Sequence, residues 1–282
     1  MWKYCAFRLA GLLLSHLPQR MSYAIATFIG DLVYLLAHRS RATVVANLSR
    51  VITSPSPEPL MTTVRKVFRS AACNYLDLMR IPRFDLPTLE RIIRIHGWHH
   101  FESALRQRKG IIVATAHLGN FDLVAQVMAS RSLGLTVLAE PLQPARLFHH
   151  VTGLRESQGL TFLPVNRANL KRVMRLLHAG GVVAVACDRD IQKKGARVTF
   201  FGTETTLPTG AVDLALRSGA FLIPAFSVRH SHGFDVFVEP PLVLPTNGVS
   251  PATAQKNLTE VIEAYIRRYP EQWVVFEPIW QP

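Results

Sequence analysis

From residue 110 onward, short apolar runs alternate with stretches whose apolar residues recur every three or four positions. The runs are rich in β-branched residues and indicate buried strands, whereas the spacing between them is typical of helices. The strand-like runs cover 110–116, 135–139, 160–164, 182–187, 198–201, 221–228 and 234–239, and helices are expected over 120–131, 144–157, 167–178, 209–218 and 251–268. This alternation predicts an α/β fold with a central, mostly parallel sheet flanked by helices.

The N-terminal part has a different pattern, with two longer apolar segments, 4–17 and 21–37, separated by Pro18, Gln19 and Arg20. They suit a helical hairpin lying in or on a membrane interface. A single spanning helix and two ordinary core helices are the alternatives, and a cleaved signal peptide is not expected because no small-residue cleavage site follows. We therefore predict a membrane-associating region over 1–59 and an α/β domain over 60–282, with a proline-rich connection at 53–59 and a first helix at 60–80.

Charge supports this division. The formal net charge is +13, and residues 1–110 hold 16 Lys and Arg against 6 Asp and Glu. A basic, apolar N-terminal part fits an anionic membrane surface. No nucleic-acid motif accompanies the charge, so no nucleic-acid partner is expected. The three cysteines are scattered and the histidine clusters lack metal-ligand spacing, so we predict neither disulfides nor a metal site.

Candidate chemistry lies where the run 110–116 gives way to the next helix. His117 follows the strand, Gly119 and Asn120 suit a turn and a helix N-cap, and Asp122 falls in the first helical turn. On one continuous helix, residues five apart would point about 140° away from each other. From a loop before the helix, His117 can instead meet Asp122, which would fix the imidazole tautomer and leave a nitrogen free as a base. The simpler alternative is a loop histidine and an aspartate that favours the helix N-terminus.

Further polar residues follow other predicted strands of the same domain. They are Glu140 after 135–139, Arg155 on the next helix, and Asp188, Arg189 and Asp190 after 182–187, with Phe201 in the later Phe200-Phe-Gly202. Ligands bind beyond the carboxyl ends of strands in such sheets. Charged groups there could hold a polar or phosphorylated substrate, with Arg189 on an anion and Glu140 on hydroxyls. Each residue taken alone is also consistent with a solvated loop charge or a salt bridge.

Together these segments resemble the bacterial lipid A biosynthesis (lysophospholipid) acyltransferase superfamily, and within it most closely the phosphatidylinositol mannoside acyltransferases. The resemblance covers nearly the whole chain. It rests on Gly97-Trp-His-His-Phe-Glu102, His117-Leu-Gly-Asn-Phe-Asp122, Ala139-Glu140-Pro-Leu, Arg155 with Gly159, Asp188-Arg189-Asp190, Phe200-Phe-Gly202, Leu207-Pro-Thr-Gly210, Leu216-Arg-Ser-Gly-Ala220, Pro224 and Tyr269-Pro-Glu-Gln-Trp273. Lipid A members usually carry Glu at the position of Asp122 and Trp at that of Phe121, which leaves the acceptor lipid open.

The resemblance implies an O-acyltransferase that moves a fatty acyl group from acyl-CoA or acyl carrier protein to a hydroxyl of a glycolipid or phospholipid. His117 would be the general base and Asp122 would orient it. No G-x-S-x-G is present, so no covalent acyl-enzyme is expected. Backbone N–H groups near Gly119 and Asn120 are candidates for stabilising the oxyanion.

The same resemblance implies the remaining assignments. Glu140, Arg155 and Asp190 would position the acceptor head, and Phe121, Phe200, Phe201 and Phe226 could line an apolar groove for the acyl chain. We expect a monomer without a cofactor at the cytoplasmic face of the bacterial plasma membrane. Two other functions stay open: a thioesterase or lipid hydrolase that uses water at the same pair, and a catalytically silent membrane-binding protein.

Overall fold

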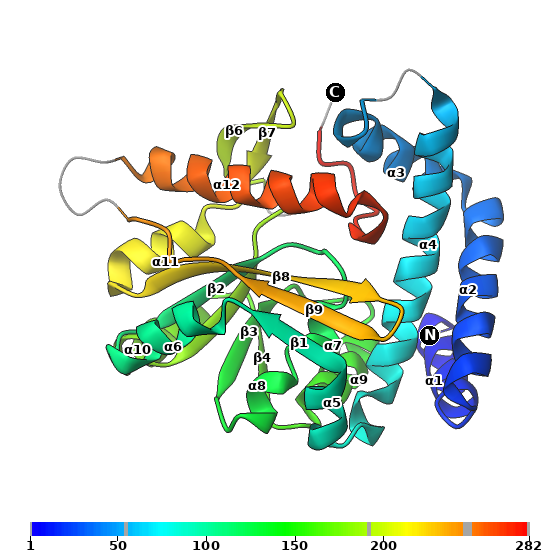
Figure 1. The fold of residues 1–282 in the computed structure, drawn as a ribbon, viewed down its shortest axis with the longest axis horizontal. Coiled ribbons are helices and arrows are strands. Elements are labelled where there is room, and N and C mark those ends of the chain that lie inside the picture. The colour runs from blue at the N-terminus through cyan, green and yellow to red at the C-terminus, as the bar shows by residue number, and fades with distance from the viewer. Residues whose placement is uncertain (1, 54–55, 191–192, 245–249, 281–282) are drawn as a thin grey trace.

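The computed structural model describes residues 2–53, 56–190, 193–244 and 250–280, and it contains a seven-stranded sheet in the order β1-β9-β8-β2-β5-β3-β4 (Figure 1). The strands are β1 (Ile93–His96), β2 (Ile111–Thr115), β3 (Leu135–Ala139), β4 (Thr161–Pro164), β5 (Val182–Ala186), β8 (Phe221–His230) and β9 (Gly233–Val238). Every neighbouring pair is parallel except β8 and β9. The predicted α/β class with a mostly parallel sheet is confirmed.

Helices cover both faces of the sheet, which explains why its central strands are apolar without alternation. On β2, Ile112 and Ala114 pack with one set of helices, whereas Ile111 faces the other set. The first set is α10 (Arg167–His178), α11 (Gly210–Ser218) and α12 (Pro251–Arg268), and the second comprises α6 (Trp98–Arg106), α8 (Val127–Ser130) and α9 (Ala145–Glu156) (Figure 1). Short elements complete the domain: α5 (Leu86–Ile92), α7 (Phe121–Val124), η1 (Ile81–Arg83) and η2 (Pro270–Gln272).

Two predicted elements differ from the structure. The run 198–201 lies in β6 (Ala196–Phe200), which pairs with β7 (Thr203–Leu207) in a separate hairpin outside the main sheet. The helix expected over 120–131 is divided into α7 and α8. At the division, Gln126 N–H bonds to the Leu123 carbonyl and Met128 N–H to the Ala125 carbonyl, so the chain tightens into three-residue turns there.

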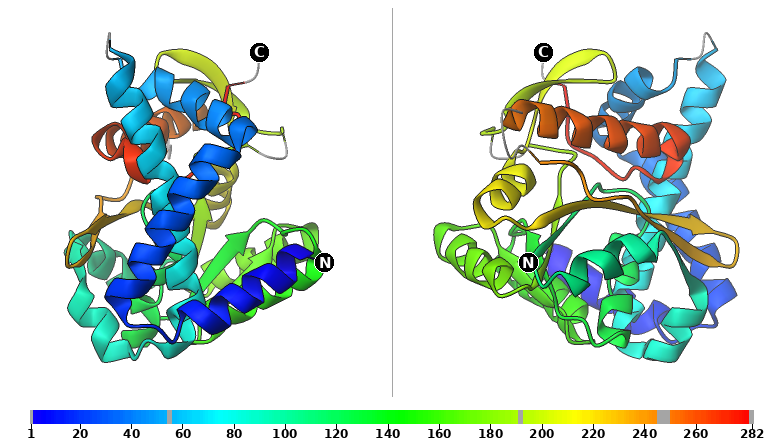
Figure 2. Two further views of the ribbon diagram at one scale, coloured as in Figure 1. Left: turned by 90° about the vertical axis from the view of Figure 1, so that its right-hand side faces the viewer. Right: turned by 60° about the vertical axis from the view of Figure 1, so that its left-hand side comes forward.

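Four helices form the N-terminal part: α1 (Trp2–Leu14), α2 (Gln19–Leu36), α3 (His38–Val51) and α4 (Pro57–Arg80). Figure 2 shows α1 and α2 on the outer side of α4. A Cβ on Gly30 of α2 would lie 2.8 Å from the Arg69 Cα of α4, so the two helices are in close backbone contact. Asp31 of α2 binds Arg65 and Arg69 of α4 through paired hydrogen bonds of 2.6 to 2.8 Å.

The outer face of α1 and α2 carries exposed apolar side chains. They include Leu9, Leu12, Leu13, Met21, Phe28, Leu32, Leu35 and Leu36. Among the described residues, no single helix meets the length and hydropathy expected of a membrane span, although α2 and α3 meet it as a pair bent by 94°. The division at residue 59 stays a prediction, and Ser54 and Pro55 of the proline-rich connection lie outside the described residues.

Candidate active site

The register of two neighbouring strands brings His117 next to Asp188. Thr115 of β2 pairs with Ala186 of β5, so His117 and Asp188 lie two residues beyond the pair, side by side at the carboxyl edge. His117 Nδ1 is 2.7 Å from Asp188 Oδ1, and the His117 backbone N–H donates to Oδ2 at 3.0 Å. Trp273 Nε1–H donates to the same Oδ2 at 2.8 Å. The carboxylate of Asp188 is thus held by three donors and is fully buried.

These partners keep Asp188 ionised. Burial opposes the negative charge, but the charge of His117 and the hydrogen bonds from His117 and Trp273 outweigh it and lower the pKa of Asp188 to about 2. An anion beside Nδ1 makes this nitrogen the N–H donor of the neutral ring. Nε2 then carries the lone pair, and no residue in the described part of the chain is hydrogen-bonded to it. The pair can therefore serve as a general base.

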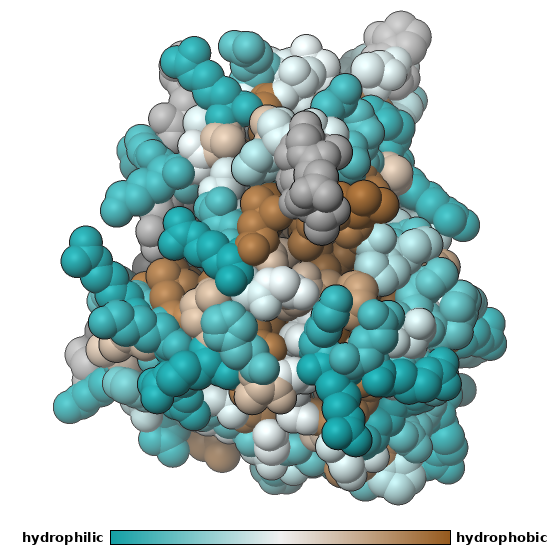
Figure 3. Space-filling model, turned by 90° about the vertical axis from the view of Figure 1, so that its left-hand side faces the viewer, coloured by the Kyte–Doolittle hydropathy of each residue, from teal (hydrophilic) through white to brown (hydrophobic). Residues whose placement is uncertain are grey.

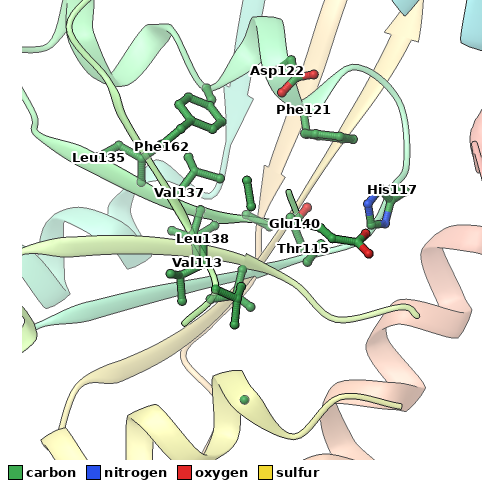
Figure 4. A pocket seen from close by; sticks show the side chains of 18 of the residues that line it. Val113, Thr115, His117, Phe121, Asp122, Leu135, Val137, Leu138, Glu140 and Phe162 are labelled. Carbon is green, nitrogen blue, oxygen red and sulfur yellow. The ribbon is translucent and has the colours of Figure 1, made fainter. Parts of the chain in front are cut away.

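Asp122 does not orient His117, contrary to the sequence prediction. Its carboxylate accepts from the Arg155 guanidinium of α9 at 2.8 Å. Figure 4 shows Asp122 beyond Phe121, away from the imidazole. The Asp122 carboxylate is paired with Arg155. His117 is paired instead with Asp188, which the register of β2 and β5 places beside it. Asp122 Oδ1 and Arg155 Nε are both buried without a hydrogen-bond partner among the described residues, so a bound ligand could satisfy them.

The loop between His117 and Asp122 is fixed by contacts of Gly119 and Asn120. Gly119 has a φ of +64°, and a Cβ there would lie 2.1 Å from the Ser227 carbonyl oxygen, so this turn requires glycine. Its N–H donates to the Gln272 carbonyl at 3.0 Å and is not available to an oxyanion, which corrects the expectation for Gly119. Asn120 caps α7 through its side chain, as expected, by accepting from Leu123 N–H.

A cavity of about 1580 Å³ opens beside His117. Figure 4 shows Thr115, Glu140 and His117 at one end, and Leu135, Val137 and Phe162 deeper inside. The deep part is lined by apolar side chains from both the sheet and the helices beneath it, including Val113, Leu135, Val137, Phe162, Phe101 and Met128. An elongated apolar ligand would fit there, with its polar end near the imidazole.

Charged residues surround the end of the cavity near His117. Arg189 is 3.2 Å from Glu140 and 2.6 Å from Glu277, so two carboxylates already offset the cation that we expected to bind an anion. Asp190 also lines the cavity, and its carboxylate accepts from Gly195 N–H at 2.6 Å. Glu277 was not foreseen from the sequence, because it lies in the irregular C-terminal tail and matches no spacing.

Two further expectations need correction. Asp188 does not touch a substrate site directly, because it is buried behind His117. Phe201, with Phe200, lies outside the cavity lining and packs against Trp280, whereas Phe121 and Phe226 do line it. Trp273, which donates to Asp188, is the other residue of the site that the sequence analysis did not assign to it. The only sequence signal for it was its place in Tyr269-Pro-Glu-Gln-Trp273.

A histidine–aspartate pair at the carboxyl edge of an α/β sheet, next to a long apolar cavity, defines a site suited to acyl transfer on lipids. The chain belongs to the bacterial lipid A biosynthesis acyltransferase family, whose profile matches residues 1–282. It is 29% identical over 261 residues to a phosphatidylinositol mannoside acyltransferase of Mycobacterium tuberculosis, and the aligned region covers 88% of this chain and 79% of the relative. A protein of the same name from Mycolicibacterium smegmatis is 28% identical over 237 residues, covering 83% and 77%.

The family membership confirms the expected resemblance and makes the protein an acyltransferase acting on a lipid or glycolipid. Across the residues that the structure describes, no three His, Cys, Asp or Glu side chains gather where they could hold a metal ion.

Proposed function

We propose that the protein transfers a fatty acyl group from a thioester of coenzyme A or acyl carrier protein to a hydroxyl of a phosphatidylinositol mannoside-like or lipid A-like acceptor. The observation that carries this proposal is the His117–Asp188 pair, 2.7 Å apart, beside the apolar cavity. The fine assignment of the acceptor follows the names of the mycobacterial relatives.

His117 Nε2 removes the proton from the acceptor hydroxyl as its oxygen attacks the thioester carbonyl. Asp188 holds the ring in the required tautomer and stabilises the imidazolium. When the tetrahedral intermediate collapses, the C–S bond breaks, the ester remains and the imidazolium returns its proton to the thiolate. Of the two backbone N–H groups expected to stabilise the oxyanion, that of Gly119 is bound to Gln272, so the Asn120 N–H is the remaining candidate.

The acyl chain occupies the deep apolar part of the cavity, which can exclude water from it. The hydroxyl-rich acceptor head lies at the charged end, where Glu140, Asp190 and Glu277 present carboxylate acceptors. Arg155 Nε adds a donor and Asp122 Oδ1 adds an acceptor, and neither atom has a hydrogen-bond partner among the residues that the structure describes. The arrangement favours a polyol acceptor over water.

The protein works at the cytoplasmic face of the bacterial plasma membrane, as a peripheral or monotopic enzyme. The exposed apolar side chains of α1 and α2 support this location, and so does the excess of positive charge in residues 1–110. The opposite side of the molecule has hydrophilic side chains over most of its surface, with apolar patches near its centre and toward one edge (Figure 3).

Thiol release from palmitoyl-CoA tests the proposal, with and without a panel of lipid acceptors, in wild type and His117→Ala. Release that requires one acceptor and is lost in the variant is the expected result, and it identifies the acceptor. Release that needs His117 but no acceptor would make the protein a thioesterase. Release that His117→Ala leaves intact would contradict the base assignment.

A further inference from the structure

A second buried carboxylate, Asp77 of α4, lies on the other side of the catalytic loop from Asp188. Its side chain is fully buried, and three side chains donate to it. Tyr23 of α2 donates to Oδ1 at 2.5 Å, Asn120 donates to Oδ2 at 2.8 Å, and Arg229 of β8 also binds Oδ2. Burial and the neighbouring Asp77 raise the pKa of Tyr23, so its hydroxyl remains a donor.

Asp77 is connected to the groups that hold the loop after His117, directly through Asn120 and indirectly through Arg229. Asn120 uses its amide nitrogen on Asp77 and its amide oxygen to cap α7. Asn74, which accepts from Arg229 at 3.3 Å, donates to the Gly119 carbonyl at 2.6 Å. Ser227, two residues before Arg229, donates to the Leu118 carbonyl at 3.0 Å. Asp77 and Arg229 therefore help to fix the conformation of 118–120, together with the backbone contact between Gly119 and Gln272.

Stability alone is a weak reason for this arrangement. Apolar residues of similar volume often replace a buried ion pair without loss of stability, because desolvation offsets the attraction between the charges. Apolar residues in place of Asp77 and Arg229 could not accept a hydrogen bond, so they would not fix the direction of the Asn120 amide. The hydrogen bond to Asp77 sets that direction, and with it the start of α7, which carries Asp122 toward Arg155.

Tyr23 extends the network to the surface. It lies on α2, whose inner face buries Ser22, Ala26 and Gly30 and whose outer face exposes Phe28, among other apolar residues. The Tyr23 hydroxyl is the contribution of α2 to the donors around Asp77. A displacement of α2 from α4 would break the hydrogen bond from the Tyr23 hydroxyl to Asp77. The position of α2 and the geometry of the loop are therefore coupled through this hydroxyl.

We propose that Asp77 is a positioning residue for acyl transfer, and that Tyr23 makes its hold on the catalytic loop depend on the docking of α2 against α4. The inference rests on the proposed function of His117. It assigns to α2 an effect on turnover in addition to any contact with lipid.

Tyr23→Phe tests the proposal by removing one oxygen, and Tyr34→Phe is its matched control. Tyr34 lies on the same helix, packs on Phe68, and its hydroxyl makes no hydrogen bond to the described residues. We expect kcat to fall about threefold to tenfold in Tyr23→Phe, because the Tyr23 hydroxyl loses its hydrogen bonds to Asp77 and from Arg229, with KM for palmitoyl-CoA close to wild type and the thermal midpoint lowered by a few degrees. An unchanged kcat, or an equal loss in Tyr34→Phe, would overturn the role of Tyr23.

The double variant Asp77→Leu/Arg229→Met separates positioning from stability. A folded protein by circular dichroism, with kcat reduced at least about tenfold and an unchanged donor KM, is the expected result. A folded double variant with wild-type kcat would show that the pair is only structural. If this variant does not fold, Tyr23→Phe decides the matter. Wild-type protein without acceptor-dependent turnover would instead contradict the proposed function, which His117→Ala tests separately.

Discussion

Two carboxylates near His117 have different partners, and single substitutions separate their roles. Asp188→Asn should lower kcat by about a thousandfold, because an amide at this position favours the wrong tautomer of the imidazole. Asp122→Asn should mainly raise the acceptor KM, by about tenfold or less, because it releases Arg155.

Steady-state kinetics from pH 5 to 9 measure both variants under the same conditions. A thousandfold loss of kcat in Asp122→Asn, with Asp188→Asn close to wild type, would return the orienting role to Asp122.

Asp188 also makes stability depend on pH. Its pKa of about 2 in the folded protein is below the ordinary value of about 3.9, so its ionised form favours the folded state. This contribution is complete above about pH 5 and is lost as the pH falls from about 5 to below 2, by about 2 kcal/mol. Urea unfolding from pH 2 to 6 should show that the difference between wild type and Asp188→Asn shrinks below pH 4. A difference that is constant with pH would contradict this.

At the scale of elements, the close contact of α2 and α4 depends on Gly30. A methyl group there would meet the backbone of Phe68 and Arg69 at 2.8 to 3.0 Å, so Gly30→Ala should lower the free energy of unfolding by about 1 to 3 kcal/mol. Gly153 is a matched control, because it is also helical and a methyl group there would have nothing within 4 Å. Gly153→Ala should raise stability by about 0.5 to 1 kcal/mol. Equal effects in chemical denaturation would contradict the close packing of α2.

The depth of the apolar cavity should set the acyl-chain preference. Val137 of β3 projects into its deep part (Figure 4), so Val137→Phe should shift the preferred donor to shorter chains. The shift is measured as activity at saturating acceptor with donors of about 8 to 18 carbons, in steps of about two methylenes. Each buried methylene contributes about 0.8 kcal/mol to binding. Phe201→Leu, outside the cavity, serves as the control. A changed preference in Phe201→Leu but not in Val137→Phe would place the chain elsewhere.

At the scale of the whole molecule, the apolar outer face of α1 and α2 should bind lipid. Phe28→Ala should weaken binding to vesicles of anionic phospholipid by about tenfold, the effect of losing one buried aromatic side chain. Val243→Ala is the control, because Val243 is exposed to 78% and lies in the segment that follows β9, outside α1 and α2. Sedimentation with vesicles at low and high salt measures both, and salt should weaken wild-type binding. Equal binding of both variants would move the lipid surface away from α2.

The periodicity of the chain predicts elements well where burial is continuous. β3, α10 and α12 occupy the predicted ranges, and His117 follows a strand as expected. β1 was missed because it has four residues, two of them exposed and charged or polar, and local pattern cannot distinguish such a strand from a loop. The run in β6 was recognised as a strand, but its place outside the main sheet depends on tertiary contacts.

The sequence by itself determined the fold class, the position of His117 at a strand end and the glycine turn that follows. Only the tertiary structure decided which carboxylate serves His117. The reason is physical: the order of residues controls hydrogen bonds a few positions apart, whereas the partner of a strand depends on the packing of the whole sheet. Because β5 is the neighbour of β2, Asp188 takes Nδ1 and Asp122 is left to Arg155.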